Sequence, residues 1–231
     1  MVKMLKQNLE QIFSTIEKGN NLGEQVIVVG ATKMVSPEVI NQAIDLGLNF
    51  VAENKVSEFR EKHDKIVGAK QHFIGHLQTN KVKYLVGQVD LIHSVDSIHL
   101  AKAISNEAVK KQVVQNILVQ VNIGKEEQKH GLLPEEVYDG VKSISSLPNL
   151  KIRGLMAMLP LTDNHDLLKS LCLEMREFFN QLKEKGFQMD YLSVGMSADY
   201  KIAIQNGSNM IRLGSTIFGK REYGGKFNGI I

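Results

Sequence analysis

A lysine that could act as a nucleophile stands directly after the first apolar run of the sequence. Residues 26–31 are apolar or small, and Thr32 and Lys33 follow them. If this run is a buried strand, the amine of Lys33 lies beside an apolar interior, which favours the neutral form that condenses with an aldehyde. A lysine at a strand end can equally extend its amine into solvent. Position alone makes Lys33 a candidate Schiff-base lysine and leaves the solvent-exposed role open.

Glycine and hydroxyl residues follow two later apolar runs in a pattern typical of phosphate sites. Gly195, Met196 and Ser197 follow one run, and Gly214 and Ser215 lie within the last one. Backbone N–H groups of glycine turns, hydroxyl groups and short helix N-termini bind phosphate oxygens. Two ordinary turns with a helix cap would use the same residue types. The pattern indicates a phosphate cradle, with ordinary turns as the alternative.

One arginine, Arg212, is set among the apolar neighbours Met210, Ile211 and Leu213. A buried guanidinium must be paired or bind a ligand, because an unpaired buried charge is costly. A structural ion pair is the plain explanation. Taken together, however, Lys33, the phosphate cradle and Arg212 fit a site for a phosphorylated aldehyde better than any one of them does alone.

Eight short apolar, β-branched runs alternate with segments that carry helix punctuation. Such alternation predicts consecutive βα units, and each gap is long enough for a crossover helix. A further helix at about residues 5–18 precedes the first run. The predicted strands are residues 26–32, 50–53, 72–75, 91–95, 117–123, 152–158, 191–194 and 210–218.

Eight such units predict an α/β fold, a single (β/α)8 TIM-type barrel with an extra N-terminal helix. A doubly wound open sheet gives much the same alternation, but residues 30–33 lack the G-x-G-x-x-G fingerprint of such sheets. No linker rich in Pro, Gly or Ser divides the chain, so we predict one domain over residues 1–231. In a barrel the reacting groups lie at the carboxyl ends of the strands, which is where Lys33 and the cradle fall.

The composition argues against several partners. The 28 basic and 25 acidic residues are spread along the chain and give a formal charge of +3, so no nucleic-acid partner is expected. The apolar stretches are only strand-sized and the N-terminus lacks a signal-peptide core, so neither a membrane span nor secretion is expected. The one cysteine, Cys172, cannot form an internal disulfide, which agrees with a reducing compartment. We expect a cytoplasmic protein.

Histidines recur near the predicted strand ends, at His72, His76 and His93. Imidazole is a common metal ligand, but no second set of ligands with a metal-like spacing accompanies them. The sequence therefore predicts no metal site.

Several ordered motifs stand at the predicted strand ends, namely residues 30–33, 53–54, 72–75, 77–81, 153–158, 195–199 and 211–219. These motifs resemble those of the pyridoxal 5′-phosphate (PLP) homeostasis protein family, and the resemblance runs along nearly the whole chain. The fold of that family is similar to the N-terminal barrel of bacterial alanine racemase. Two departures are Val51 and Ala52, where the family often has Phe-Gly, and His76, where a proline is frequent. These departures concern local loop shape.

The resemblance implies PLP as the cofactor and gives individual residues a role. Lys33 would hold PLP as an internal aldimine, and Arg212 would face the pyridine nitrogen. Asn54 and Met156 would line the ring. The phosphate site would consist of Met196, Ser197, Gly214 and Ser215.

The resemblance also implies a function without catalysis, namely PLP binding in intracellular vitamin B6 homeostasis. An arginine at the ring nitrogen leaves that nitrogen unprotonated and makes the ring a poorer electron sink. Racemases with this barrel also use a tyrosine from a second domain, which a chain of 231 residues is not expected to hold. The implied partners are PLP and PLP-dependent apo-enzymes, and the implied state is a monomer or weak dimer.

Two enzymatic alternatives remain open at this stage. One is a PLP-dependent amino-acid racemase or lyase, with Lys33 as one base and His76, His93 or Tyr200 as the other. The other is a Schiff-base aldolase acting on a phosphorylated sugar. The aldolase needs the lysine and the phosphate cradle but no arginine that faces a pyridine ring.

Overall fold

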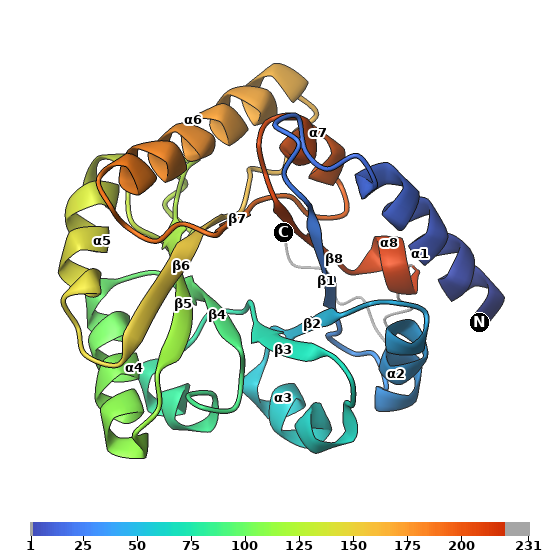
Figure 1. Ribbon diagram of the computed structural model, residues 1–231, viewed down its shortest axis with the longest axis horizontal. Helices are drawn as coiled ribbons and strands as arrows, with labels where there is room; N and C mark the ends of the chain where they lie inside the picture. Colours follow the sequence, from blue (N-terminus) through green and yellow to red (C-terminus); the bar gives the residue numbers. More distant parts are fainter. Residues whose placement is uncertain (1, 220–231) are drawn as a thin grey trace.

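The computed structural model describes residues 2–219, whose eight strands form a closed parallel barrel (Figure 1). Each strand pairs in parallel with the next one along the chain, and the eighth closes the barrel by pairing with the first. The strands are β1 Ile27–Ala31, β2 Phe50–Glu53, β3 Lys70–Phe73, β4 Leu91–Val95, β5 Gln115–Val121, β6 Leu150–Ala157, β7 Tyr191–Ser193 and β8 Met210–Leu213. The predicted (β/α)8 barrel is confirmed.

Helices surround the strands in an outer ring, as crossover connections between parallel strands require (Figure 1). The connection between β3 and β4 carries only a 3-10 helix. The α-helices are α1 Val2–Ile16, α2 Pro37–Asp45, α3 Val56–Lys62, α4 Ile98–Lys111, α5 Val137–Ser145, α6 His165–Glu184, α7 Tyr200–Gln205 and α8 Ser215–Phe218. The 3-10 helices are η1 His63–Lys65, η2 Thr79–Tyr84 and η3 Pro134–Glu136.

The extra N-terminal helix, α1, packs on the side of the barrel beside α2 and α8 (Figure 1). Leu5, Leu9 and Ile12 are buried at helical spacing and form its inner face. Asn8 donates a hydrogen bond from Nδ2 to the carbonyl of Ile217 at 2.9 Å. The helix therefore supports the segment that follows β8, where part of the predicted phosphate cradle lies.

The last strand is shorter than predicted. The sequence indicated a strand over residues 210–218, but β8 ends at Leu213 and α8 begins at Ser215. Ile217 and Phe218 both donate backbone hydrogen bonds to the carbonyl of Gly214, which closes the first helical turn. The apolar residues of α8 continue the β8 pattern, so hydrophobicity alone did not mark the break.

Apolar side chains fill the space between strands and helices. The stripe of α6 that faces the barrel consists of Leu168, Leu171, Cys172, Met175, Phe179 and Leu182, all buried. Burial raises the pKa of the Cys172 thiol to about 12, so this thiol is an inert core group. No helix among residues 2–219 is long and apolar enough to cross a membrane. The prediction of one domain over residues 1–231 extends beyond the described residues and stays a prediction.

Candidate functional site

A cavity of about 740 Å³ lies at the carboxyl ends of the barrel strands. This volume is within the range of sites for small molecules and cofactors. Seven of the eight predicted site residues line it: Lys33, Asn54, Met196, Ser197, Arg212, Gly214 and Ser215. The structure therefore brings together residues that are separated by as many as 182 positions in the sequence, from Lys33 to Ser215.

The eighth predicted residue, Met156, does not line the cavity. Its side chain is 1% exposed and packs in the barrel interior against a cluster that includes Leu118 and Met210. Met158, two residues further along the chain, lines the cavity instead. Met156 lies within β6, whereas Met158 directly follows the end of this strand, where the cavity begins.

Buried hydrogen bonds fix the backbone directly before Lys33. Thr32 is fully buried, and its hydroxyl donates to Oε1 of Glu53 at 2.7 Å. Lys62 donates from Nζ to the Thr32 carbonyl at 3.0 Å and to the same Glu53 oxygen at 2.9 Å. Burial raises the pKa of Glu53, and the hydrogen bonds from Lys62 and Thr32 oppose this rise. The end of β1 is therefore anchored to β2 and α3.

The backbone is also fixed directly after Lys33. Met34 has a φ of 58°, in the left-handed region, so the chain turns sharply here. The Met34 N–H donates to Oε2 of Glu58 at 2.6 Å, which holds this turn. The half-buried Lys33 side chain extends into the cavity between two anchored neighbours. Among the described residues, its amine has neither a hydrogen-bond acceptor nor an ion-pair partner, so it is free to react with a ligand.

Arg212 lies in the wall of the cavity and is held by neutral acceptors. Its Nη1 donates to the carbonyl and to the hydroxyl of Ser193, both at 2.6 Å, and its Nη2 donates to the Ala157 carbonyl at 2.9 Å. Burial lowers the pKa of Arg212 to about 10, while the charge of Asp199 opposes this, so the guanidinium is protonated at neutral pH. The structural ion pair considered from the sequence is not found within residues 2–219. Arg212 is a fixed donor facing the cavity.

Two buried histidines lie behind Arg212. Nδ1 of His93 is 3.1 Å from the Ser193 hydroxyl, and Nε2 of His93 is 3.0 Å from Nδ1 of His72. Burial lowers the pKa of His72 to about 3, and it lowers the pKa of His93 well below its usual range. Both rings are therefore neutral at physiological pH. They support Arg212 through the Ser193 hydroxyl and place no second positive charge beside the guanidinium.

The loops after β7 and β8 bring hydroxyl groups and backbone N–H groups together. Oγ of Ser197 accepts from the backbone N–H groups of Gly214 and Thr216, at 3.4 Å each. Gly195, which starts the first loop, has a φ of 105°, and a Cβ there would lie 2.8 Å from Cβ of Ala203. Only glycine fits this position without strain. The resulting group of donors at the start of α8 suits a phosphate.

Asn54 provides an acceptor that the protein leaves unused. Its Oδ1 is buried and has no hydrogen-bond partner in the described part of the chain, and the residue lines the cavity. An unsatisfied buried acceptor costs about 1–3 kcal/mol, which a donor group on a ligand would offset. Free amine, fixed guanidinium, anion cradle and unused acceptor together match the functional groups of PLP: an aldehyde, a pyridine nitrogen, a phosphate and a phenolic hydroxyl.

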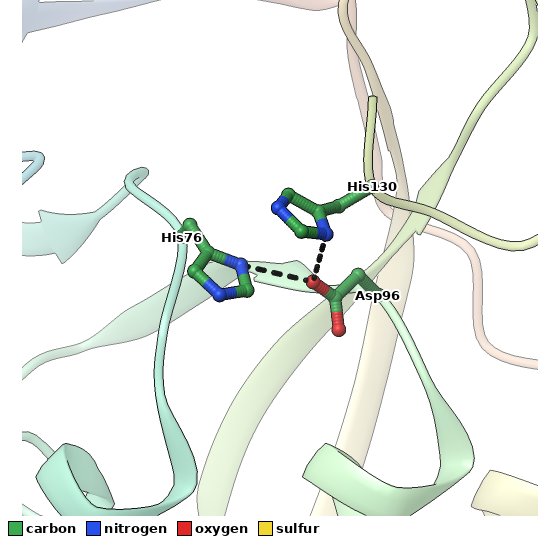
Figure 2. A group of neighbouring side chains, drawn as sticks. All are labelled: His76, Asp96 and His130. Carbon is green, nitrogen blue, oxygen red and sulfur yellow. Dashed lines mark ion pairs between the residues drawn. The ribbon is translucent and has the colours of Figure 1, made fainter. Parts of the chain in front are cut away.

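Three residues at the mouth of the cavity form a group that sequence reasoning missed. His76, Asp96 and His130 follow three different strands and their side chains meet (Figure 2). His76 is a possible base by its position in the sequence, whereas no sequence feature gives Asp96 or His130 a role. Their separations of 20 and 34 residues give no short metal-binding motif, so only the closed barrel could have indicated this group.

Fold and site together define a single-barrel protein whose cavity is lined by a lysine after the first strand and by hydroxyl and glycine residues after the last two. The family model described as alanine racemase, N-terminal domain, matches residues 3–222. The pyridoxal phosphate homeostasis protein of Aquifex aeolicus is 39% identical over 222 residues, which cover 95% of this chain and 97% of that protein. That of Escherichia coli K12 is 31% identical over 227 residues, covering 96% and 97%. The chain belongs to the alanine racemase N-terminal domain family and, within it, to the pyridoxal phosphate homeostasis proteins, which confirms the resemblance stated above.

Solved structures agree with this assignment. PipY of Synechococcus elongatus, solved with PLP bound, has a TM-score of 0.81 at 26% identity, covering 93% of this chain and all of PipY. A protein of unknown function from Bifidobacterium adolescentis has a TM-score of 0.88 at 26% identity, covering 94% and 95%. Alanine racemase of Clostridium difficile has a TM-score of 0.79 at 16% identity, covering 98% of this chain and 59% of the racemase, and shares the fold.

Proposed function

We propose that this protein binds PLP and acts in PLP homeostasis, with Lys33 as the residue that carries the cofactor. The observation that carries the proposal is the free amine of Lys33, which shares one cavity with Arg212 and the Ser197 cradle. Relatives over nearly the whole chain are named pyridoxal phosphate homeostasis proteins, and the similar PipY was solved with PLP bound. When bound, PLP supplies an aldehyde and a ring that can accept electrons.

The residues of the chain divide the binding task among them. Lys33 would form the covalent bond, since its amine has no partner among residues 2–219 and its backbone is fixed on both sides. Arg212 would donate a hydrogen bond to the pyridine nitrogen, and Asn54 would line the ring from the end of β2. The phosphate would accept hydrogen bonds from the Ser197 hydroxyl and from the backbone N–H groups of Gly214 and Thr216. These bonds would replace the contacts that the three groups now make with one another.

A role without catalysis is part of the proposal. A carboxylate beside the ring nitrogen would keep that nitrogen protonated, whereas the protonated Arg212 only donates a hydrogen bond to it. The ring therefore stays a weak electron sink. Of the three residues considered as a second base, His93 and Tyr200 are buried away from the cavity and only His76 lines it. The proposed partners are PLP-dependent apo-enzymes that receive the cofactor in the cytoplasm.

The decisive experiment is borohydride reduction of the PLP-loaded protein followed by peptide mapping. We expect an absorption band in the near-visible that reduction removes, with one pyridoxyl group on Lys33. Lys33→Ala should abolish the adduct, whereas Lys55→Ala, which changes an exposed lysine close to the cavity, should keep it. A stoichiometric adduct in Lys33→Ala would show that another residue carries the cofactor. A reducible bond that forms only with a phosphorylated sugar, without the near-visible band, would indicate the aldolase.

A further inference from the structure

Three side chains that can bind a metal ion meet at the mouth of the cavity. His76 follows β3, Asp96 follows β4 and His130 lies in the long loop after β5 (Figure 2). One donor atom from each lies within 4.8 Å of the other two. Nδ1 of His76 is 3.2 Å from Oδ2 of Asp96, and Nδ1 of His130 is 3.9 Å from the same oxygen. Both imidazoles therefore point a nitrogen at one carboxylate.

These separations are close to those of a coordinated zinc ion. Ligand atoms about 2.0–2.1 Å from a tetrahedral zinc lie roughly 3.3 Å from one another. The contact of His76 with Asp96 already has this length, whereas His130, at 3.9 Å from the same oxygen, has to approach it. Both histidine side chains are about half exposed, so they can make this adjustment. The two rings stack nearly parallel, with centroids 4.0 Å apart, so both histidines lie on the same side of the Asp96 carboxylate and would have to open from this stacking to bind one ion.

The backbone that carries each residue is fixed. His76 follows Gly75, where a Cβ would lie 1.9 Å from the Asn54 carbonyl oxygen, so the ends of β2 and β3 are in close contact. Asp96 lies between the last residue of β4 and Ser97, whose hydroxyl caps α4 by accepting from the Leu100 N–H at 3.2 Å. Ligands on such a rigid framework lose little entropy when a metal binds.

The loop that carries His130 is also anchored. The His130 carbonyl accepts a hydrogen bond from Nε2 of Gln120 at 2.8 Å. Asn122 donates from Nδ2 to the carbonyls of Glu126 and Lys129. Gly131 has a φ of 132° and lies so close to the backbone of β5 that a Cβ would contact the Asn122 nitrogen at 2.6 Å. The position of His130 opposite Asp96 is therefore set by its loop and not by chance contact of two surface side chains.

The donor set selects the kind of ion. Two imidazole nitrogens and one carboxylate suit zinc and its neighbours among the transition metals, whereas magnesium and calcium prefer oxygen ligands alone. We propose that His76, Asp96 and His130 bind one divalent transition-metal ion such as Zn²⁺ at the rim of the cavity. Three protein ligands leave a coordination position open, and His76 also lines the cavity, so the ion lies beside the cofactor site. This site does not depend on the proposed PLP function.

The test is equilibrium dialysis of the tag-free protein against Zn²⁺ after treatment with a chelator, with metal content measured by mass spectrometry. We expect one zinc ion per chain. Replacing a partner of a metal ligand typically weakens binding about 10–100-fold, so replacing a ligand should weaken it by at least about tenfold. His76→Ala, His130→Ala and Asp96→Asn should each have this effect, and titration calorimetry gives its size.

Two histidine variants are the matched controls. His99→Ala and His165→Ala each remove an exposed imidazole elsewhere on the surface and should keep one bound zinc ion per chain. Circular dichroism confirms that each variant is folded. The absence of stoichiometric zinc in the wild-type protein would overturn the proposal and leave the group as hydrogen-bonded histidines only. Stoichiometric binding that survives in all three ligand variants would overturn it as well, since the ion would then lie elsewhere.

Discussion

Arg212 donates from Nη1 to the hydroxyl of Ser193 at 2.6 Å, and this contact joins the wall of the cavity to the histidines inside the barrel. Ser193 is fully buried at the end of β7, and Arg212 lies on the neighbouring strand β8. The guanidinium lines the cavity and has no carboxylate partner among the residues that the structure describes, so neutral acceptors hold it in place. The orientation of the proposed ligand-binding donor therefore depends on a serine that does not line the cavity.

Ser193→Ala should weaken PLP binding and destabilise the fold together. The change leaves Arg212 with one acceptor fewer at Nη1 and leaves Nδ1 of His93 without a partner. Loss of a buried partner costs about 1–3 kcal/mol, and we expect a loss of unfolding free energy of this size in chemical denaturation. Titration with PLP, followed by absorption, should show a lower affinity.

The exposed Ser143 provides the control, because Ser143→Ala should change neither quantity. Normal PLP affinity in a measurably destabilised Ser193→Ala protein would show that Arg212 does not need Ser193 for its orientation.

The buried histidines should make the protein sensitive to acid. The pKa of His72 is lowered from its ordinary 6.5 to about 3 by burial, so the unfolded chain takes up this proton at a higher pH than the folded protein does. The stability due to neutral His72 is complete above pH 6.5 and is lost as the pH falls toward 3. The loss approaches about 1.4 kcal/mol per pH unit for each such histidine. Denaturation midpoints measured between pH 7 and pH 4 check this prediction.

His93→Gln should flatten that pH dependence, since it removes the second buried imidazole while keeping a polar side chain. The variant lowers stability at pH 7 but loses less on acidification. His165→Ala, at an exposed position, should leave the slope as it is in the wild-type protein. Equal slopes in the wild type and in His93→Gln would contradict the assignment of a neutral buried His93.

Gly195→Ala should be far more harmful than Gly186→Ala, although both glycines have positive φ values of 105° and 88°. A left-handed conformation costs an alanine about 1–2 kcal/mol at either position. At Gly195 the added Cβ would also collide with Ala203, which adds about 1–3 kcal/mol, whereas at Gly186 it meets no atom within 4 Å. Chemical denaturation measures the difference.

Phosphate binding separates the two variants further. Gly195 starts the loop that carries Ser197, so its alanine variant should lose affinity for PLP, whereas Gly186, after α6, has no contact with the site. Similar PLP affinities in the two variants would mean that this loop does not form the phosphate cradle.

Much of this architecture follows from the sequence because buried parallel strands are apolar and short. Seven of the eight predicted strands lie within about three residues of the observed ones, and Lys33 follows β1 as its position indicated. The predicted end of β8 was wrong, because Ile217 and Phe218 continue the apolar pattern although the backbone becomes helical after Gly214. Hydrophobicity reports burial, and it does not distinguish a strand from a buried helical turn.

The details of the site depend on how deep each side chain lies in the barrel and on contacts between loops that are distant in the sequence. Met156 lies within β6 and Met158 just after it, and only the barrel shows which of them reaches the cavity. The contacts of Asp96 with His76 and His130 likewise arise from three loops and have no local signature. The position of Lys33 was predictable because a strand end is a local feature. The hydrogen bond from Lys62 to the Thr32 carbonyl, which fixes the preceding backbone, was not predictable.

The PLP-loaded protein should not exchange the α-hydrogen of L-alanine faster than free PLP does. Arg212 stays protonated and can donate to the pyridine nitrogen without giving up its proton, so the ring is a weak electron sink. Proton NMR of alanine in deuterated water measures the exchange. Exchange well above the level of free PLP would make the protein a racemase or lyase. Its loss in His76→Ala would then identify His76, which lines the cavity, as the second base.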